Sequence, residues 1–337
     1  MKKAERGNKR QTSNHKEEIA MTKTERIAQI TEAMKSFNKE SYQKAEVLPE
    51  LFSLQSEMVA RIFGTEAAEE GSLKIWDVEA ELDRRNASFG HVADEALYNF
   101  KNESKAVCNL IKSEVSGNKG EFKAFGRLEA LRGSHRILRN VEITSKTCRT
   151  ELDGVVLTKR GVFIVEVKNT RRNILIDEEG NYYRMGEYMH WDSNIGEKMQ
   201  MRETLLRQIL ESNGYPGCKI MSVIVFTNRE VEVKNRDRNL KTTFLGPLPY
   251  IIDECNGTEC FSDTDLDRMT EAIETARSSE SYKMDIDINQ YKQDFATVIA
   301  EIEEAQAAAE RKEGKHRTTI REIFLKIFAP EKVPAAA

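Results

Sequence analysis

The sequence predicts an α/β protein in which a region of strands carries helical additions on both sides. Two consecutive strand-like runs, 151–157 and 161–168, lie near the middle of the chain, and a third buried-strand run follows at 219–226. The first 117 residues instead place apolar residues at mixed spacings of three and four between charges, which is the helical period. Polar helical patterns return after residue 262.

The N-terminal region is expected to be helical after a basic tail. Residues 1–16 contain six Lys or Arg and one Glu, a composition that predicts a disordered tail. Within residues 17–117 three or four helices are expected, since 19–37, 42–63 and 92–115 have the helical period and glycines between the last two mark breaks. This helical N-terminal region is therefore expected to differ in structure from the region of strands.

The run 161–168 ends in two charged residues on one face. Side chains alternate between the two faces of a strand, so Val162, Ile164, Glu166 and Lys168 share a face. The continuous apolar run before Glu166 is typical of a strand buried on both faces. A carboxylate and an ammonium at the end of such a strand need partners or a function.

The preceding run brings a second carboxylate to this place. A two-residue turn at 159–160 pairs Thr158 with Gly161, and counting back places Asp153 directly opposite Glu166. Directly opposite Cβ atoms lie about 4.5–5.5 Å apart, and like charges there are destabilising. A divalent cation would neutralise them. A three-residue turn with a bulge at Gly161 is the alternative, and it would shift the pairing by one residue.

These residues belong to a longer pattern. It consists of Gly120-Glu121, Leu152-Asp153-Gly154, the run 161–169 and a Gln on a following helix. The pattern resembles the NERD (nuclease-related) domain of the PD-(D/E)xK nuclease superfamily, over residue 119 to roughly residue 228. The resemblance implies a PD-(D/E)xK nuclease-like core, a mixed central sheet flanked by helices.

By this resemblance, Asp153 and Glu166 would bind Mg²⁺ or Mn²⁺ together with the Val167 carbonyl. Lys168 would orient or deprotonate the attacking water. The residue types suit this chemistry, because Mg²⁺ prefers oxygen ligands, takes one or two carboxylates and keeps several waters. Such an ion activates water and stabilises displacement at a phosphodiester.

Two further members of the site have competing candidates. Glu121 matches the Gly-Glu that opens the first helix of the family, and Glu129 is the alternative two turns further along. Gln200 fits the family's glutamine loosely, because the preceding proline is absent and the spacing differs by two residues, and Gln208 competes with it. The alternative for Glu121 is an ordinary acidic residue in the first turn of a helix, where the helix dipole favours it. The alternative for the glutamines is an ordinary exposed position on an amphipathic helix.

Basic residues near the site are candidates for contacts with nucleic-acid phosphates, which supply most of the affinity of such complexes. Arg171 and Arg172 directly follow the strand, and a solvated turn is their alternative role. Lys234, Arg236 and Arg238 make a later loop basic.

Composition limits the classes of protein to which the chain can belong. The formal net charge of −4 argues against a general nucleic-acid coat protein, although a nuclease needs only a local basic groove. The five cysteines form no CxxC motif and the five histidines are scattered, so a reducing compartment is expected and zinc is not. No apolar run approaches the ~20 residues of a membrane-spanning helix. We expect a cytoplasmic protein that does not interact with membranes.

The sequence therefore predicts a Mg²⁺-dependent deoxyribonuclease with its core at 118–255 and a helical region at 256–337. The alternative is a catalytically inactive nuclease-like module that binds or scaffolds within a larger assembly. Its helical regions would then contact a protein partner or a second copy of the chain. The complete Asp/Glu/Lys set favours the enzyme, because a scaffold does not need such a costly cluster of charges.

Overall fold

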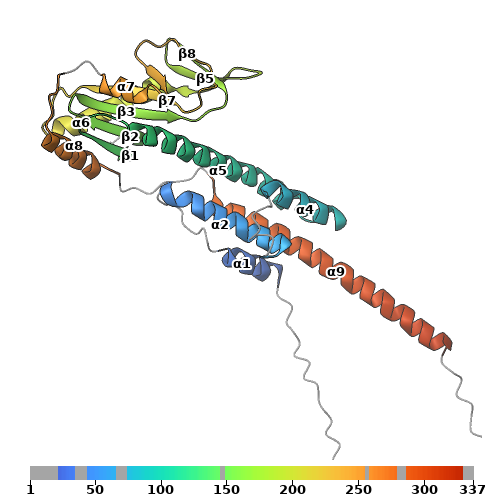
Figure 1. The fold of residues 1–337 in the computed structure, drawn as a ribbon. Coiled ribbons are helices and arrows are strands. Elements are labelled where there is room, and N and C mark those ends of the chain that lie inside the picture. Colours follow the sequence, from blue (N-terminus) through green and yellow to red (C-terminus); the bar gives the residue numbers. More distant parts are fainter. Residues whose placement is uncertain are drawn as a thin grey trace, which may run out of the picture. The chain divides into compact units, whose positions relative to one another are not determined.

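The computed structural model describes residues 22–34, 44–65, 74–144, 149–254, 258–278 and 286–328 (Figure 1). The tail expected at 1–16 lies outside them. Contacts divide the chain into a sheet unit, Asn109–Tyr282, and a helical unit, formed by Met1–Cys108 and Lys283–Ala337. Among the described residues, no helix is both long and apolar enough to cross a membrane.

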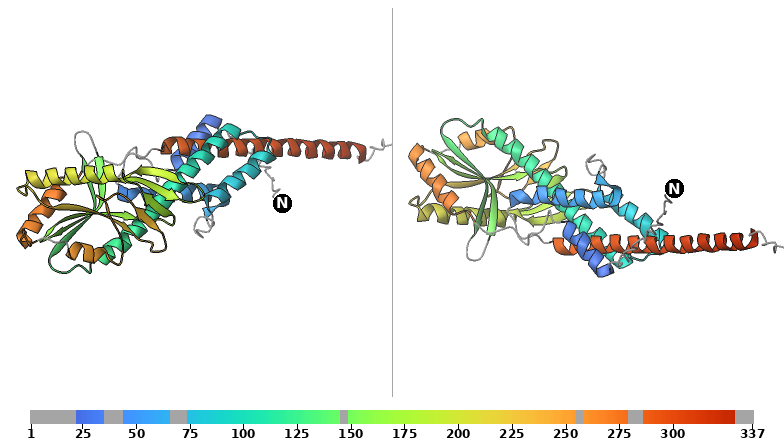
Figure 2. Two further views of the ribbon diagram at one scale, coloured as in Figure 1. Left: turned by 90° about the horizontal axis from the view of Figure 1, so that it is seen from above. Right: turned by 90° about the horizontal axis from the view of Figure 1, so that it is seen from below.

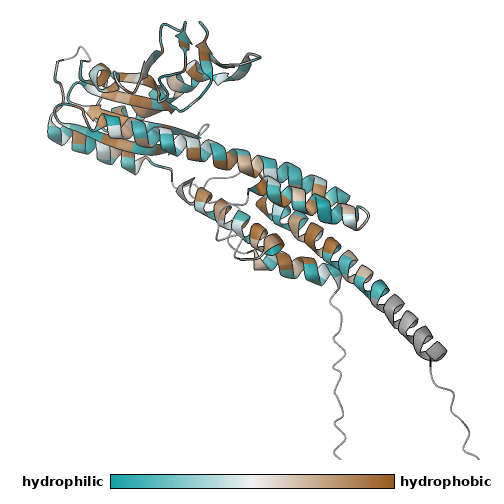
Figure 3. Ribbon diagram, turned by 45° about the vertical axis from the view of Figure 1, so that its right-hand side comes forward, coloured by the Kyte–Doolittle hydropathy of each residue, from teal (hydrophilic) through white to brown (hydrophobic). Residues whose placement is uncertain are grey.

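The helical unit contains α1 (Lys23–Ala33), α2 (Lys44–Phe63), α4 (Ile75–Ser88), the first part of α5 (Asp94–Leu128) and α9 (Ile288–Phe328). Three or four helices were expected in the N-terminal region, and α4 is the fourth. Figure 3 shows apolar and polar residues alternating along them, as expected for helices that bury one face. The boundary expected at residue 118 falls inside α5, which is one continuous helix.

The core of the helical unit is aromatic where α5 and α9 pack together. The ring of Phe100 stacks on that of Tyr291 with 5.4 Å between centroids, and Ser104 lies 3.2 Å from the Tyr291 hydroxyl. Burial, followed by the charge of Asp294, raises the pKa of Glu103 to about 7. A carboxyl group that resists ionisation therefore sits at this helix contact.

The main sheet of the sheet unit has five strands in the order β1-β2-β3-β7-β9. Their bounds are β1 (His135–Thr144), β2 (Arg149–Thr158), β3 (Gly161–Lys168), β7 (Ile220–Phe226) and β9 (Lys241–Phe244). The pairs β1–β2 and β2–β3 are antiparallel, whereas β3–β7 and β7–β9 are parallel. The sheet is mixed, as the sequence predicts.

A second sheet has four strands in the order β6-β5-β4-β8. It is formed by β4 (Asn173–Ile176), β5 (Asn181–Met185), β6 (His190–Asn194) and β8 (Val233–Asn235). The first three strands pair antiparallel, and β4 pairs parallel with β8. This sheet follows β3 directly in the chain, so it lies next to the end of that strand.

Helices cover both faces of the main sheet (Figure 2). On one face, Val162 and Ile164 belong to an apolar cluster with residues of α6 (Ile195–Ser212) and α8 (Asp263–Thr275). On the other face, Phe163 packs in a cluster with residues of α5 and of α7 (Leu248–Asp253). The strand is buried on both sides, which explains its unbroken apolar run.

The β2–β3 hairpin confirms the two-residue turn. Thr158 pairs with Gly161, and Gly154 pairs with Val165. One further step along this register sets Asp153 opposite Glu166, on the face that packs against α6.

Candidate active site

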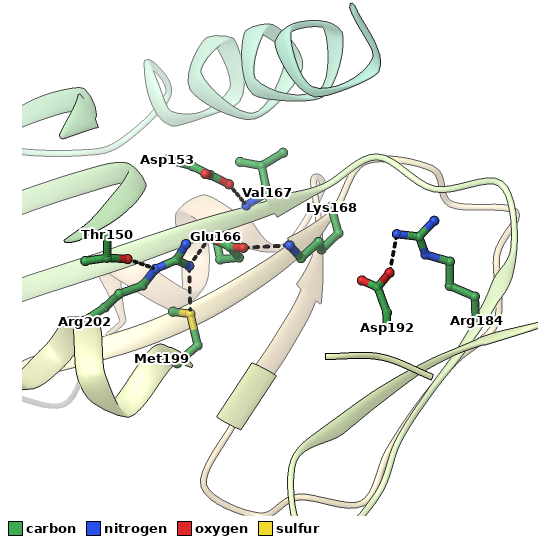
Figure 4. Close-up of polar contacts among 9 residues, drawn as sticks. All are labelled: Thr150, Asp153, Glu166, Val167, Lys168, Arg184, Asp192, Met199 and Arg202. Atoms are coloured by element: carbon green, nitrogen blue, oxygen red, sulfur yellow. Dashed lines mark hydrogen bonds and ion pairs between the residues drawn. The ribbon is translucent and has the colours of Figure 1, made fainter. Parts of the chain in front are cut away.

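Glu166 is the centre of a buried polar cluster at the carboxyl end of β3 (Figure 4). Its side chain is 6% exposed, and each of its oxygens meets a cation. Lys168 Nζ lies 2.7 Å from Oε1, and Arg202 Nη1 lies 2.5 Å from Oε2. Burial raises the pKa of Glu166, but the charges of these two cations outweigh it and hold the pKa below its usual value.

Arg202 is the site residue that the sequence did not identify. It lies on α6, its side chain is 12% exposed, and its Nε donates to Thr150 Oγ1 on β2 at 3.2 Å. The spacing of Met199, Arg202 and Leu206 places all three on the helix face that packs on the sheet. The sequence feature that could have identified Arg202 is its position within the apolar face of an amphipathic helix, because a charge buried there needs a partner.

Asp153 is held beside Glu166 by the backbone. Its Oδ2 accepts a hydrogen bond from the Val167 N–H at 2.7 Å. Burial and then the charge of Glu166 raise the pKa of Asp153, although Lys168 and Arg202 oppose the shift. Lys168 and Arg202 thus stabilise the ionised form of Glu166 more than that of Asp153.

Two glycines of the sequence pattern allow α5 to pack closely on the hairpin. A Cβ at Gly120 would lie 2.7 Å from the Cβ of Asn169 and 3.3 Å from Val167 Cγ1. A Cβ at Gly154 would lie 2.5 Å from the ring of Phe125. The contacts of 2.7 Å and 2.5 Å are too short for a Cβ atom, so glycine is required at each position.

The contact at Gly120 also determines where Glu121 and Glu129, the two candidates for an acidic supporting residue, lie relative to the site. Glu121, the next residue, is half-buried and lies at the level of the end of β3. Glu129 lies about 12 Å further along the helix axis, by the rise of 1.5 Å per residue. There it is exposed and pairs with Arg139 of β1 at 3.8 Å. The geometry favours Glu121 over Glu129 as a supporting residue.

The glutamine candidates on α6 are both exposed. Gln200 and Gln208 lie on the solvent side of the helix, and the structure brings Arg202 to the carboxylates instead. The arginine candidates are also exposed, since Arg171 and Arg172 follow β3 in the turn toward β4.

The donor atoms fit a hard divalent cation. Asp153, Glu166 and the Val167 carbonyl supply oxygens, which suit Mg²⁺ or Mn²⁺ better than zinc. In the part of the chain that the structure describes, no group of three or more His, Cys, Asp or Glu side chains could hold a metal. A magnesium site does not require one, because Mg²⁺ commonly takes one or two carboxylates and completes its octahedron with water.

A mixed sheet covered by helices on both faces, with an Asp, a Glu and a Lys converging at one strand end, defines a nuclease-like α/β core. Residues 116–227 match the family model of the nuclease-related domain, which belongs to the PD-(D/E)xK-like nuclease superfamily. This part of the chain is thereby identified as a nuclease-related domain. Searches of curated proteins and of solved structures find no match.

Proposed function

We propose that the protein is a metal-dependent nuclease that hydrolyses phosphodiester bonds of nucleic acid, with DNA as the expected substrate. The observation that carries the proposal is the buried pair of Asp153 and Glu166 with the Lys168 ammonium 2.7 Å from Glu166. Burial and the charge of Glu166 raise the pKa of Asp153, so a bound cation would stabilise the ionised form of this carboxyl group beside Glu166.

Each residue has a distinct proposed role. Asp153, Glu166 and the Val167 carbonyl would hold Mg²⁺ or Mn²⁺, which when bound supplies a Lewis acid for water activation and charge stabilisation. Lys168 orients the attacking water or accepts its proton. Arg202 keeps Glu166 ionised and fixed in orientation.

Glu121 and Gln200 are proposed as supporting residues. Glu121 lies at the level of the strand end, and its carboxylate would orient water near the metal ligands. Gln200 is exposed, so its contribution would be to contact substrate. Replacing each by Ala and measuring kcat and KM separately tests these roles, since lost substrate contacts change KM first.

The test is cleavage by the purified full-length protein. Linear, circular and single-stranded DNA are incubated with and without Mg²⁺, and loss of the circular form reports internal cleavage. Asp153→Asn and Glu166→Gln should each abolish cleavage and remove any rise in melting temperature caused by the divalent ion. Glu211→Gln, an exposed carboxylate on α6, is the matched control. Full activity in both site variants would reject the assignment.

A second function is favoured by one specific observation. Both Glu166 oxygens are already neutralised by Lys168 and Arg202, so the cluster is stable as a self-contained network. The domain would then be an inactive nuclease-like binding module, which acts through nucleic acid or protein contacts. In that case the protein shows neither cleavage nor a Mg²⁺-dependent rise in melting temperature, and it still binds its partner.

A further inference from the structure

A basic groove lies in the sheet unit beside the candidate active site. Its volume is about 720 Å³, and it is lined by α5 and by the loops that follow β3 and β7. The charged residues in its lining are Lys112, Lys119, Lys123, Arg171, Arg229 and Glu230. Five cations thus face one carboxylate, in a protein whose formal net charge is −4.

Four of the cations in this basic groove are available to a ligand. Lys119 and Lys123 are four residues apart on α5, so they share a helix face, and Arg171 and Arg229 come from the two loops. All four are exposed, and none forms an ion pair with another described residue. By contrast, Lys234 pairs with Glu232 at 3.3 Å and Arg236 with Glu178 at 3.8 Å.

The basic groove and the active site share the end of β3. The Thr227 N–H donates to the Lys168 carbonyl at 3.1 Å, and the Thr227 hydroxyl bonds Asn169 Oδ1 at 2.6 Å. Asn169 Nδ2 in turn donates to the Ser116 carbonyl of α5 at 2.8 Å. The groove lies on the α5 side of this strand end, and Glu166 lies on the α6 side. A polyanion in the groove therefore passes the end of β3 at Asn169 and Thr170.

An exposed aromatic residue on α5 lies beside the basic groove. Phe122 is 79% exposed, although it is a large apolar side chain. It comes three residues after Lys119 and one before Lys123, so it flanks the face that lines the groove. Aromatic platforms beside a positive groove are used to stack the bases of single strands. Bases in a duplex are already stacked on one another.

We infer that the basic groove binds the phosphates of a single-stranded segment of the nucleic-acid substrate, with a base stacked on Phe122. This inference rests on the proposed nuclease function and specifies the form of its substrate. Of the phosphate contacts expected from the sequence, Arg171 lines this groove. The inference adds four further cations, which are Lys112, Lys119, Lys123 and Arg229.

The first experiment measures binding without cleavage. Fluorescence anisotropy with a labelled single-stranded DNA and the matching duplex is recorded for the full-length protein in EDTA, over a series of salt concentrations. Each phosphate neutralised on a single strand contributes about 0.7 to the salt slope. Lys119→Ala with Lys123→Ala should therefore lower the slope by about 1.4, which weakens binding about 25-fold at 0.1 M salt. Arg136→Ala with Lys159→Ala, which removes two cations that pair with Asp267 and Asp263, should leave both values unchanged.

The second experiment tests the stacking contact. Phe122→Ala should weaken binding of the single strand at least about fivefold and leave binding of the duplex unchanged, because stacking on an aromatic residue needs an unpaired base. Tyr250→Ala removes another exposed aromatic residue, 53% exposed on α7, and is the matched control.

The outcomes separate this inference from the proposed function. Unchanged affinity and salt slope in the double lysine variant, with cleavage intact, overturn the groove assignment and leave the nuclease in place. Preferred binding of the duplex by the native protein overturns the single-strand preference. Groove-dependent binding of the single strand without any Mg²⁺-dependent cleavage supports the inference and rejects the enzyme.

Discussion

Replacement of Arg202 by Met tests whether the positive charge on α6 is what makes the buried carboxylate cluster stable. Met retains a long apolar side chain that can fill the space beside Met199, but it removes the guanidinium. The change leaves Glu166 with one cation, Lys168, at 2.7 Å. It also frees the Thr150 hydroxyl from its bond to Arg202 Nε.

The expected loss of stability follows from burial. Breaking a buried ion pair by removing one partner costs about 3–5 kcal/mol. Because Lys168 still neutralises part of the charge of Glu166, we expect the lower end, about 3 kcal/mol, for Arg202→Met. Glu166→Gln in the same background should recover much of this loss, with a coupling energy of about 2 kcal/mol in the double-mutant cycle.

The assay is amide hydrogen exchange at the buried amides of β3, measured for the native protein, the two single variants and the double variant. It reports the opening free energy of the sheet unit alone, whereas a melting curve of a chain with two compact units mixes both transitions. A change below about 0.5 kcal/mol in Arg202→Met, or a coupling energy near zero, would refute the reasoning.

Three further predictions concern other parts of the chain. Gly120→Ala should destabilise the sheet unit by about 1–3 kcal/mol because of its 2.7 Å contact with Asn169, measured by the same exchange. Gly126→Ala, with nothing within 4 Å, should instead stabilise α5 by up to about 1 kcal/mol. Lys168→Ala should preserve the Mg²⁺-dependent rise in melting temperature and slow cleavage about 10²-fold or more; a lost rise would make it a metal-site residue. The pKa of Glu103 is raised from 4.5 to about 7, so its contribution to the stability of the helical unit should be full below pH 4.5 and be lost as pH rises through 7. If amide hydrogen exchange in α9 has the same pH profile in Glu103→Gln as in the native protein, this prediction about Glu103 is wrong.

The hairpin could be predicted from the sequence because its determinants are local. A two-residue turn fixes the register, and the period of two then places Asp153 and Glu166 together. The long helices could be predicted for the same reason, since their periodicity is contained within each segment.

The partners of the hairpin could not be predicted, because they depend on contacts distant in sequence. Arg202 reaches Glu166 across 36 residues, and a charged residue on an amphipathic helix resembles an ordinary surface residue until the helix is docked. The second sheet was also missed, because its strands have only three to five residues and are partly polar. The pairing of α9 with α1 likewise joins opposite ends of the chain.

The separation of Arg202 from Glu166 has a consequence for the newly made chain. The β2–β3 hairpin can form as soon as its residues leave the ribosome, since hairpins form in about 1–10 μs. The arginine that neutralises Glu166 is added 36 residues later, after about 2–7 s at usual rates of synthesis. The parallel pairing of Glu166 with Ile224 comes later still. A truncated chain that ends before α6 therefore carries both acids with Lys168 but without Arg202, and the cluster can be completed only when nearly the whole domain has been made.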